Sequence, residues 1–215
     1  MRTRKLKKSL FVPEKASSRG IFDSVVQAAN KLFDSLDFDS TTTNKIADKA
    51  GVSIGSLYQY FPNKEKIFTY LIDRMIEENR RVFLSVVKEN SGKSMREMTA
   101  SLVDVSVDTF LKRKHFLRVI FSQLHRLNKI EDLLESRRIL SKEMAAVLRA
   151  QFPTEIRHEN LESTLFLAMN SFMGVLEAHC MDKNPQISET QLKTELTRLL
   201  ESYLLIRPME GAQLN

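Results

Sequence analysis

Residues 41–66 constrain the fold of this 215-residue chain more than any other stretch. They read TTTNKIADKAGVSIGSLYQYFPNKEK, and Gly51 separates two short segments of helical pattern. Thr41 or Thr42 can cap the first segment, because a threonine oxygen accepts a hydrogen bond from an otherwise unpaired N–H of the first turn. Glycine enters the left-handed conformation without a Cβ clash, so the first helix can end sharply. The stretch therefore predicts two helices that cross at a tight turn.

The second helix of this pair is short and presents polar side chains. Ser53 is its expected N-cap, and we expect the helix to run from Ile54 to Phe61, with Leu57 and Phe61 facing inward. Such a helix is too short to be stable alone. In a helix-turn-helix, a helix of this kind lies in the major groove of DNA with its N-terminal residues toward the base edges. The pair therefore predicts a DNA-reading motif.

Two groups of residues extend this motif into a longer pattern. The first group belongs to the preceding helix and its exit: Val25, Val26, Ala28, Ala29, Leu32, Phe33 and Phe38. The second group lies in the motif itself: Thr41, Thr42, Ile46, Ala47, Ala50, Gly51, Val52, Ser53, Gly55, Leu57, Tyr58, Phe61, Lys64 and Glu65. Over residues 20–70 the pattern resembles the TetR family of one-component transcriptional regulators. Asp37 stands where that family usually places a glycine, so we expect slight left-handed strain there and an unchanged fold.

The composition favours an all-α fold in two parts. Six glycines and five prolines leave little room for a turn-rich β architecture. We expect a basic, flexible N-terminal arm at residues 1–16 and a three-helix DNA-binding domain with a helix-turn-helix at residues 17–62. Residues 63–215 are expected to form a C-terminal helical bundle for ligand binding and dimerisation.

One cysteine and short apolar runs indicate the cellular compartment. Cys180 is the only cysteine, which excludes an intramolecular disulfide. The apolar run near the N-terminus stops at Pro13, too early for a secretory signal, and no stretch reaches the length of a membrane span. We therefore expect a cytoplasmic protein that has no membrane association.

The net charge of +6 lies entirely at the N-terminus. Residues 1–19 hold seven basic residues against Glu14, so residues 20–215 sum to zero; the basic residues are Arg2, Arg4, Lys5, Lys7, Lys8, Lys15 and Arg19. A basic arm beside a helix-turn-helix can follow the phosphate backbone or enter a minor groove, which adds salt-dependent affinity. The alternative is a solvated leader that makes no contact.

Beyond residue 63 the apolar spacing predicts helices only. A helix that opens near Asn63 and continues to Glu89 would be about 40 Å long. Ser94 and Glu97 form a capping box for the next helix, which is expected to reach Lys112. Further helices are expected over residues 115–127, 129–152, 160–181 and 188–207.

The last two predicted helices carry more apolar surface than one core-facing stripe needs. The resemblance implies that they pair with their two-fold mates in a four-helix bundle, and Gly174 would allow a close approach. The residues expected at this dimer interface are Leu165, Phe172, Leu176, Leu196, Leu200 and Tyr203. A homodimer implies a palindromic operator, with the reading helices about 34–36 Å apart. An ordinary monomer core is the alternative reading of the same pattern.

Side-chain chemistry and the resemblance together suggest which residues contact DNA. The amide of Gln59 can pair bidentately with adenine. Lys64 lies where its own charge and a helix N-terminus would both attract a phosphate. The full expected set is Thr42, Ser53, Ile54, Gly55, Ser56, Tyr58, Gln59, Tyr60 and Lys64. For both tyrosines, packing within the small domain is the alternative.

Apolar and methionine side chains of the second part suit a small apolar effector, which would release the protein from DNA by changing the spacing of the reading helices. The expected lining is Phe110, Phe116, Phe121, Leu124, Met144, Phe166, Met169 and Met173. The same residues equally suit a packed interior. A DNA-binding regulator without an effector, controlled by a protein partner or by abundance, is the alternative. The resemblance implies repression as the usual outcome.

No motif for catalysis, metal or cofactor binding occurs in the sequence. It has no glycine-rich phosphate loop, no nucleophile elbow and no metalloprotease histidine pair. His179 and Cys180 are adjacent, and neighbours on a helix diverge by about 100°, which makes them poor joint ligands. We expect a protein that is not an enzyme and that needs no metal and no cofactor.

Overall fold

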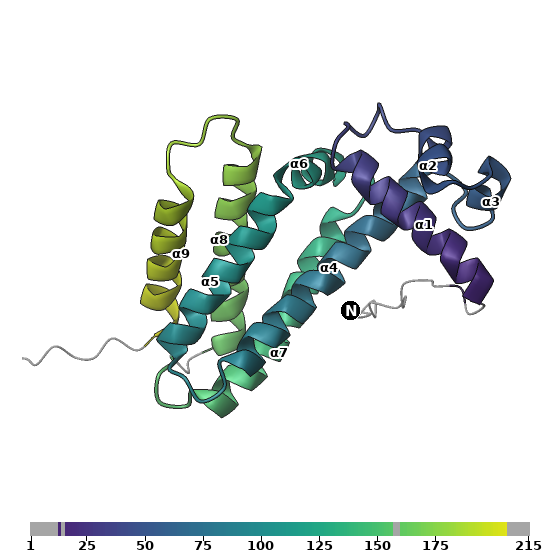
Figure 1. The fold of residues 1–215 in the computed structure, drawn as a ribbon. Helices are drawn as coiled ribbons and strands as arrows, with labels where there is room; N and C mark the ends of the chain where they lie inside the picture. Colours follow the sequence, from purple (N-terminus) through teal and green to yellow (C-terminus); the bar gives the residue numbers. More distant parts are fainter. Residues whose placement is uncertain (1–12, 14–15, 157–159, 206–215) are drawn as a thin grey trace, which may run out of the picture. The chain divides into compact units, whose positions relative to one another are not determined.

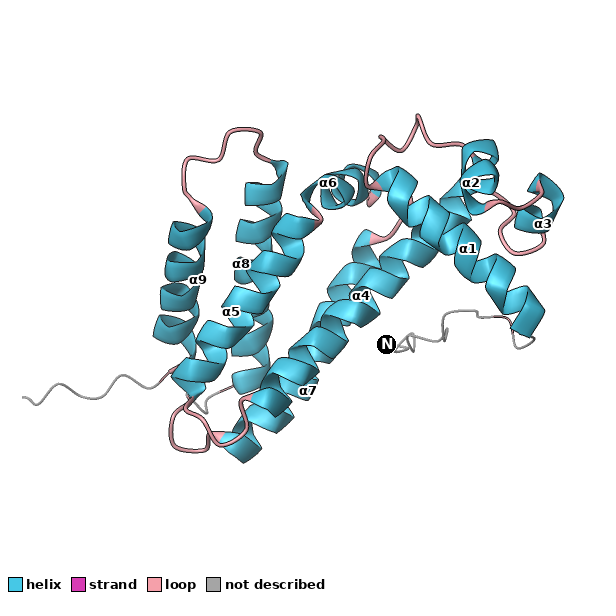
Figure 2. Ribbon diagram, in the orientation of Figure 1, coloured by secondary structure: helices cyan, strands magenta, loops and turns pink. Residues whose placement is uncertain are grey.

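The computed structural model describes residue 13 and residues 16–156 and 160–205. Among these residues the regular structure is entirely α-helical, and one isolated antiparallel bridge joins Ile156 to Leu205 (Figures 1 and 2). The expected all-α fold is confirmed. None of the helices in these ranges combines the length and the apolar character that a membrane span needs.

Nine helices follow one another along the described residues. They are α1 (Ala16–Phe33), α2 (Thr43–Ala50), α3 (Ile54–Tyr58), α4 (Lys64–Glu89), α5 (Met95–Lys112), α6 (Lys114–Gln123), α7 (Ile130–Gln151), α8 (Leu161–Met181) and α9 (Glu189–Leu204). The chain forms two compact units: unit 1 holds the described residues of 1–80 and 113–136, and unit 2 those of 81–112 and 137–215. The units therefore do not follow the boundary expected at residue 63.

Capping residues begin several helices where the sequence predicts them. The Ser94 N–H donates to Glu97 Oε2 over 3.0 Å, and the Glu97 N–H donates to Ser94 Oγ over 3.2 Å, which completes the capping box of α5. Ser188 and Gln191 form the same arrangement before α9. The long α4 also ends at Glu89 as expected. These features depend on residues three positions apart, so the local sequence is sufficient to specify them.

Three helices end at least three residues before the predicted position. The third, α3, ends at Tyr58 rather than Phe61, because Pro62 disfavours the helical conformation in the residue before it. Helix α6 ends at Gln123 rather than Leu127, and the turn that follows contains Asn128 at φ 53°. Helix α9 ends at Leu204, since Leu205 enters the bridge with Ile156; residues 206 and 207 lie outside the described residues.

The left-handed strain expected at Asp37 is absent. Among the described non-glycine residues, only Asn128 and Asn160 have positive φ angles. The turn after α1 closes differently, since the Thr41 hydroxyl donates to the Asp37 carbonyl over 3.1 Å. The buried Thr41 therefore helps to close this turn without a left-handed residue at position 37.

Unit 1 is built around an aromatic core. Phe33, Phe38 and Phe68 lie within 5.8 Å of one another between ring centroids, and Phe116 of α6 reaches Phe68 at 6.2 Å. Helix α1 packs on α2 and α3. Residues 113–136 thus share one core with the helix-turn-helix, although they are far from it in sequence.

Unit 2 buries most of the residues expected at a dimer interface. Helices α5, α8 and α9 pack against one another in this unit. Five expected interface residues lie in its core: Leu165, Phe172, Leu176, Leu196 and Leu200. These five side chains offer little surface to a second copy of the chain, and their place at a dimer interface stays a prediction. Tyr203 is 40% exposed and stays a candidate.

Candidate DNA-binding site

The turn between α2 and α3 has the geometry that the sequence predicts. Thr42 caps α2, and its hydroxyl oxygen accepts a hydrogen bond from the Lys45 N–H over 3.3 Å. Gly51 follows α2 at φ 68° and ψ 31°. The Val52 N–H reaches back to the Ala47 carbonyl over 3.1 Å, which satisfies a carbonyl that the helix end leaves unpaired. The turn therefore fixes the direction in which α3 leaves.

Helix α3 is anchored by one buried side chain, and most of its other residues are exposed. Ser53 caps it by accepting from the Ser56 N–H over 3.1 Å, and Leu57 is buried in the core of unit 1. Ile54, Gly55 and Gln59 are exposed. A Cβ built on Gly55 would meet only the Ser53 hydroxyl, at 3.9 Å, so nothing in the protein requires glycine there. The expected base-reading residues thus form an accessible surface around the start of α3.

A small polar pocket lies beside this surface, with a volume of about 240 Å³. It is lined by Thr41, Thr42, Thr43, Tyr58, Pro62, Asn63 and Lys64. The Tyr58 hydroxyl lies 3.1 Å from the Thr43 hydroxyl. The Lys64 ammonium donates one hydrogen bond, to the Phe38 carbonyl over 2.8 Å, which leaves two of its three N–H groups for another acceptor.

Three expected phosphate contacts meet in this pocket, namely Thr42, Tyr58 and Lys64. Their hydroxyl and ammonium groups are the donors that bind phosphate oxygens in protein–DNA complexes. Thr43 and Asn63 also line the pocket, although the sequence pattern did not predict them there. Asparagine is a preferred N-cap residue, and the side-chain oxygen of Asn63 caps α4 by accepting a hydrogen bond from the Lys66 N–H over 2.9 Å.

The two tyrosines of the motif lie in different surroundings. Tyr58 is half-exposed at the pocket, which favours a role at the surface. The Tyr60 ring instead packs edge-on against Phe22, with 5.9 Å between ring centroids. The Tyr60 ring therefore has a structural role in unit 1, and its phosphate contact stays a prediction.

The residues expected to line an effector pocket are divided between the two units. Phe116, Phe121 and Leu124 belong to unit 1; Phe110, Met144, Phe166, Met169 and Met173 belong to unit 2. Phe110, Phe116, Leu124 and Met144 are buried, and the others are half-buried. None of them lines the polar pocket beside α3 or the groove between α5 and α9.

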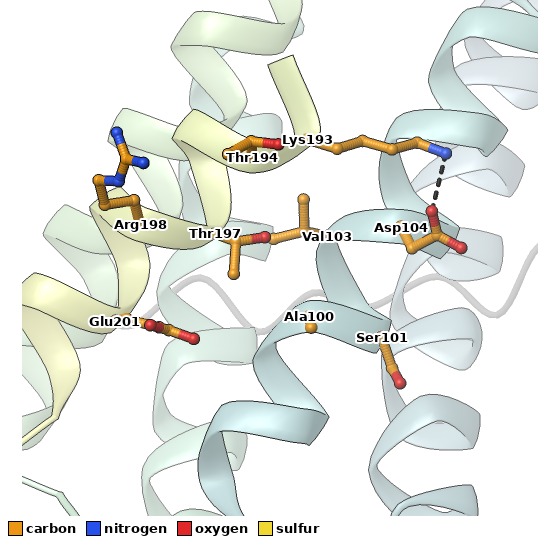
Figure 3. A pocket seen from close by; sticks show the side chains of 9 residues that line it. All are labelled: Ala100, Ser101, Val103, Asp104, Lys193, Thr194, Thr197, Arg198 and Glu201. Atoms are coloured by element: carbon orange, nitrogen blue, oxygen red, sulfur yellow. Dashed lines mark ion pairs between the residues drawn. The ribbon is translucent and has the colours of Figure 1, made fainter. Parts of the chain in front are cut away.

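The groove between α5 and α9 in unit 2 has a volume of about 650 Å³ (Figure 3). Most of the residues that line it have polar or charged side chains: Ala100, Ser101, Val103, Asp104, Lys193, Thr194, Thr197, Arg198 and Glu201. The Lys193 ammonium lies 2.7 Å from Asp104 Oδ1 and also contacts Asp108 and Glu189. Hydrogen bonds to Asp104 and Asp108 raise the pKa of Lys193 above its usual value.

A buried polar cluster in unit 2 was missed by sequence reasoning. Arg137 of α7 is only 9% exposed and donates to Asn170 Oδ1 over 3.1 Å and to the Glu177 carboxylate. The sequence pattern does indicate that Arg137 is buried, because this residue lies at helical spacing from the buried Ser141, Met144 and Leu148. Such a position in the stripe predicts a buried arginine.

Two family profiles match this chain. Residues 25–71 match the family described as bacterial regulatory proteins, tetR family. Residues 94–204, more than half of the chain, match the Tetracyclin repressor-like C-terminal domain.

Individual relatives agree with these matches. The nucleoid occlusion factor SlmA of Actinobacillus pleuropneumoniae is 38% identical over 71 residues, which are 33% of this chain and 32% of SlmA. The Bacillus subtilis HTH-type transcriptional regulator YerO is 21% identical over 101 residues, 47% of this chain and 35% of YerO. The chain thus spans about a third of the length of these relatives.

Solved structures share the fold over most of the chain. A TetR-family transcriptional regulator from Mesorhizobium loti superposes with a TM-score of 0.73 at 18% identity, covering 88% of this chain and 97% of that one. The fatty acid degradation regulator FadR from Bacillus halodurans gives 0.64 at 22% identity, with the same coverage. From the two profiles, the shared fold and the helix-turn-helix, the chain belongs to the TetR family of DNA-binding transcriptional regulators, which are not enzymes.

Proposed function

We propose that this protein is a homodimeric, ligand-responsive repressor that binds a palindromic operator. The observation that carries the proposal is the convergence of Thr42, Tyr58 and Lys64 on one polar pocket beside the exposed face of α3. Contacts to phosphate position a helix on DNA, and the side chains around its start then read bases. One such helix makes few contacts, so two-fold pairing is needed for useful affinity.

Selection from randomised duplex DNA tests this proposal. The purified protein is expected to enrich an inverted repeat whose half-sites lie about 10–10.5 base pairs apart, or a multiple of that spacing. A lone half-site would contradict the dimeric reading. Failure to enrich any duplex at low salt would overturn the proposal as a whole.

Gln59→Ala is expected to relax sequence preference at one position of each half-site and to cost about 1–3 kcal/mol of binding free energy. Gln59 is exposed directly after α3, where its amide can reach a base edge. Repeating the selection with the variant measures the preference, and Gln151→Ala is the matched control on an exposed glutamine of unit 2. An unchanged preference would remove Gln59 from base reading.

Lys64→Met is expected to weaken binding to all duplexes alike and to reduce the salt slope of the binding constant by about 1. Methionine keeps the length of the side chain and removes the charge. Titrations over a range of salt concentrations give the slope. Lys88→Met, at the far end of α4 and exposed, should leave the slope unchanged. Equal slopes for wild type and Lys64→Met would show that Lys64 does not contact phosphate.

The proposed dimer surface is the exposed face of α8 together with neighbouring positions of α9. Its members recur at helical spacing on α8 and then on α9: Leu167, Ser171, Gly174, Val175, Ala178, Leu199 and Tyr203. Leu167, Val175, Leu199 and Tyr203 are 53%, 40%, 41% and 40% exposed, and a patch of large apolar side chains at the surface is typical of a face that a partner covers. The occupant we propose is a second copy of the same face. Of the residues expected at the interface from the sequence, this surface includes Tyr203.

The half-buried residues of α8 support an effector with a polar group on an apolar body. Phe166, Met169 and Met173 share a side of this helix with Asn170 and Glu177, which bind Arg137. A ligand carboxylate could replace Glu177 as the partner of Arg137, because an arginine fork binds any carboxylate bidentately.

A chain-length series of alkyl carboxylates, with alcohols and amines of equal length as controls, tests this effector class. The carboxylates are expected to release operator DNA, and the controls to have weaker effects. Release by the alcohols alone would favour the purely apolar effector. If none of these compounds alters DNA binding or thermal stability, the ligand-responsive part fails and control by a protein partner or by abundance is favoured.

A further inference from the structure

The loop between α1 and α2 is held by two cationic side chains that contact the same phenylalanine. The Lys64 ammonium nitrogen lies 4.3 Å from the centroid of the Phe38 ring and also donates to the Phe38 carbonyl. The guanidinium carbon of Arg126 lies 5.3 Å from the same centroid. Arg126 Nη1 is also 3.3 Å from Asp39 Oδ1. Lys64 and Arg126 therefore share one aromatic partner, although they are far apart in sequence.

These contacts restrict the direction of the Lys64 side chain. A free lysine side chain samples many rotamers, and part of this conformational entropy is lost whenever the ammonium binds a phosphate. Here the carbonyl and ring of Phe38 already hold the ammonium at the polar pocket. Phe38 is 2% exposed and packs against Phe33 and Phe68, so its position depends on the surrounding residues.

Arg126 belongs to residues 113–136 of unit 1. In the sequence, the residues before and after this segment both belong to unit 2. The turn that carries it is fixed by Lys129, whose ammonium lies 2.7 Å from Asp73 Oδ1 and 2.9 Å from Asp132 Oδ2. Burial alone would lower the pKa of Lys129, but its hydrogen bonds to Asp73 and Asp132 prevail and raise it. The Arg126 side chain itself is 56% exposed, so its contacts can break and re-form at small cost.

We infer that Arg126 is a positioning residue for DNA binding, which acts through Phe38 and Asp39 on Lys64 and on the loop that leads to Thr42. It links residues 113–136 to the phosphate pocket through the ring of Phe38, which Arg126 and Lys64 both contact. A shift of this segment moves Arg126 away from Phe38 and leaves Lys64 less well oriented. The inference rests on the proposed phosphate contact of Lys64.

A double-mutant cycle on the full-length protein tests this inference. Binding of the selected duplex is measured by fluorescence anisotropy for wild type, Arg126→Gln, Lys64→Met and the double variant. Arg126→Gln is expected to weaken binding about three- to ten-fold in the wild-type background, from the loss of one cation–π contact and one surface ion pair. In the Lys64→Met background the same change should have less than about a two-fold effect, because Arg126 can no longer orient an ammonium group that is absent.

Two further variants separate positioning from the effect of charge. Arg126→Lys keeps the charge and loses the planar guanidinium, so it should retain only part of the affinity if the contacts with Phe38 and Asp39 matter. Arg198→Gln removes an exposed arginine of unit 2 and should leave binding within about two-fold of wild type. Thermal unfolding checks that every variant is folded.

The outcomes distinguish this inference from the proposed function. An equal loss for Arg126→Gln in both backgrounds would mean that Arg126 contacts DNA itself, and no loss in either would mean that it plays no part. Both results overturn the inference and leave the proposed function intact. If the wild-type protein binds no duplex, the proposed function fails first.

Discussion

Gly174→Trp is expected to convert the homodimer into a monomer and to weaken operator binding by about 10²–10⁴-fold, because the second half-site is then no longer bound intramolecularly. Gly174 lies within α8, on the proposed dimer surface. A Cβ built on it meets no atom within 4 Å, so a larger side chain does not clash inside the protein itself. It would clash with a second helix packed closely against this face. Analytical ultracentrifugation gives the oligomeric state, and anisotropy gives the affinity.

Matched variants make this test specific to the surface. Gly174→Ala should preserve the dimer and add up to about 1 kcal/mol of stability, since alanine favours a helix more than glycine does. Val105→Trp places the same bulk on an exposed position of α5 and should leave the dimer intact. A Gly174→Trp protein that stays dimeric would exclude this face of α8 as the interface.

The features that the sequence predicted correctly in unit 1 depend on neighbouring residues. Gly51 at φ 68°, Thr42 as the cap of α2 and Ser53 as the cap of α3 each follow from a side chain or a backbone angle within one helical turn. The same holds for the inward position of Leu57. A short stretch contains all the groups that form such features, so its pattern is sufficient to predict them.

The features that could not be predicted from the sequence depend on which face of a helix packs against which neighbouring helix. Helix α8 is apolar on two sides, and periodicity alone does not say which side faces its own core. The prediction therefore selected Leu165 and Phe172, which are buried, rather than Leu167 and Val175, which are exposed. The place of residues 113–136 beside the helix-turn-helix is likewise a long-range property.

Arg137→Ala is expected to lower the free energy of unfolding by about 2–4 kcal/mol, a large effect for one residue. The guanidinium is buried and binds both Asn170 and Glu177, which lie on α8 while Arg137 lies on α7. Its removal leaves the Glu177 carboxylate, which is 28% exposed, without its cationic partner. For a protein of this size the loss should lower Tm by roughly 5–12 °C. Thermal and denaturant unfolding measure both quantities.

Comparison with an exposed arginine shows why the location of the ion pair decides the outcome. Arg198 also pairs with a glutamate, but its side chain is 71% exposed, and Arg198→Ala should cost less than about 0.5 kcal/mol. Replacing both members, as Arg137→Met with Glu177→Leu, should recover much of the loss, because no buried charge is then left unpaired. Equal losses at positions 137 and 198 would contradict the buried ion pair. If the double replacement also abolished the response to alkyl carboxylates, Arg137 would serve effector recognition as well as stability.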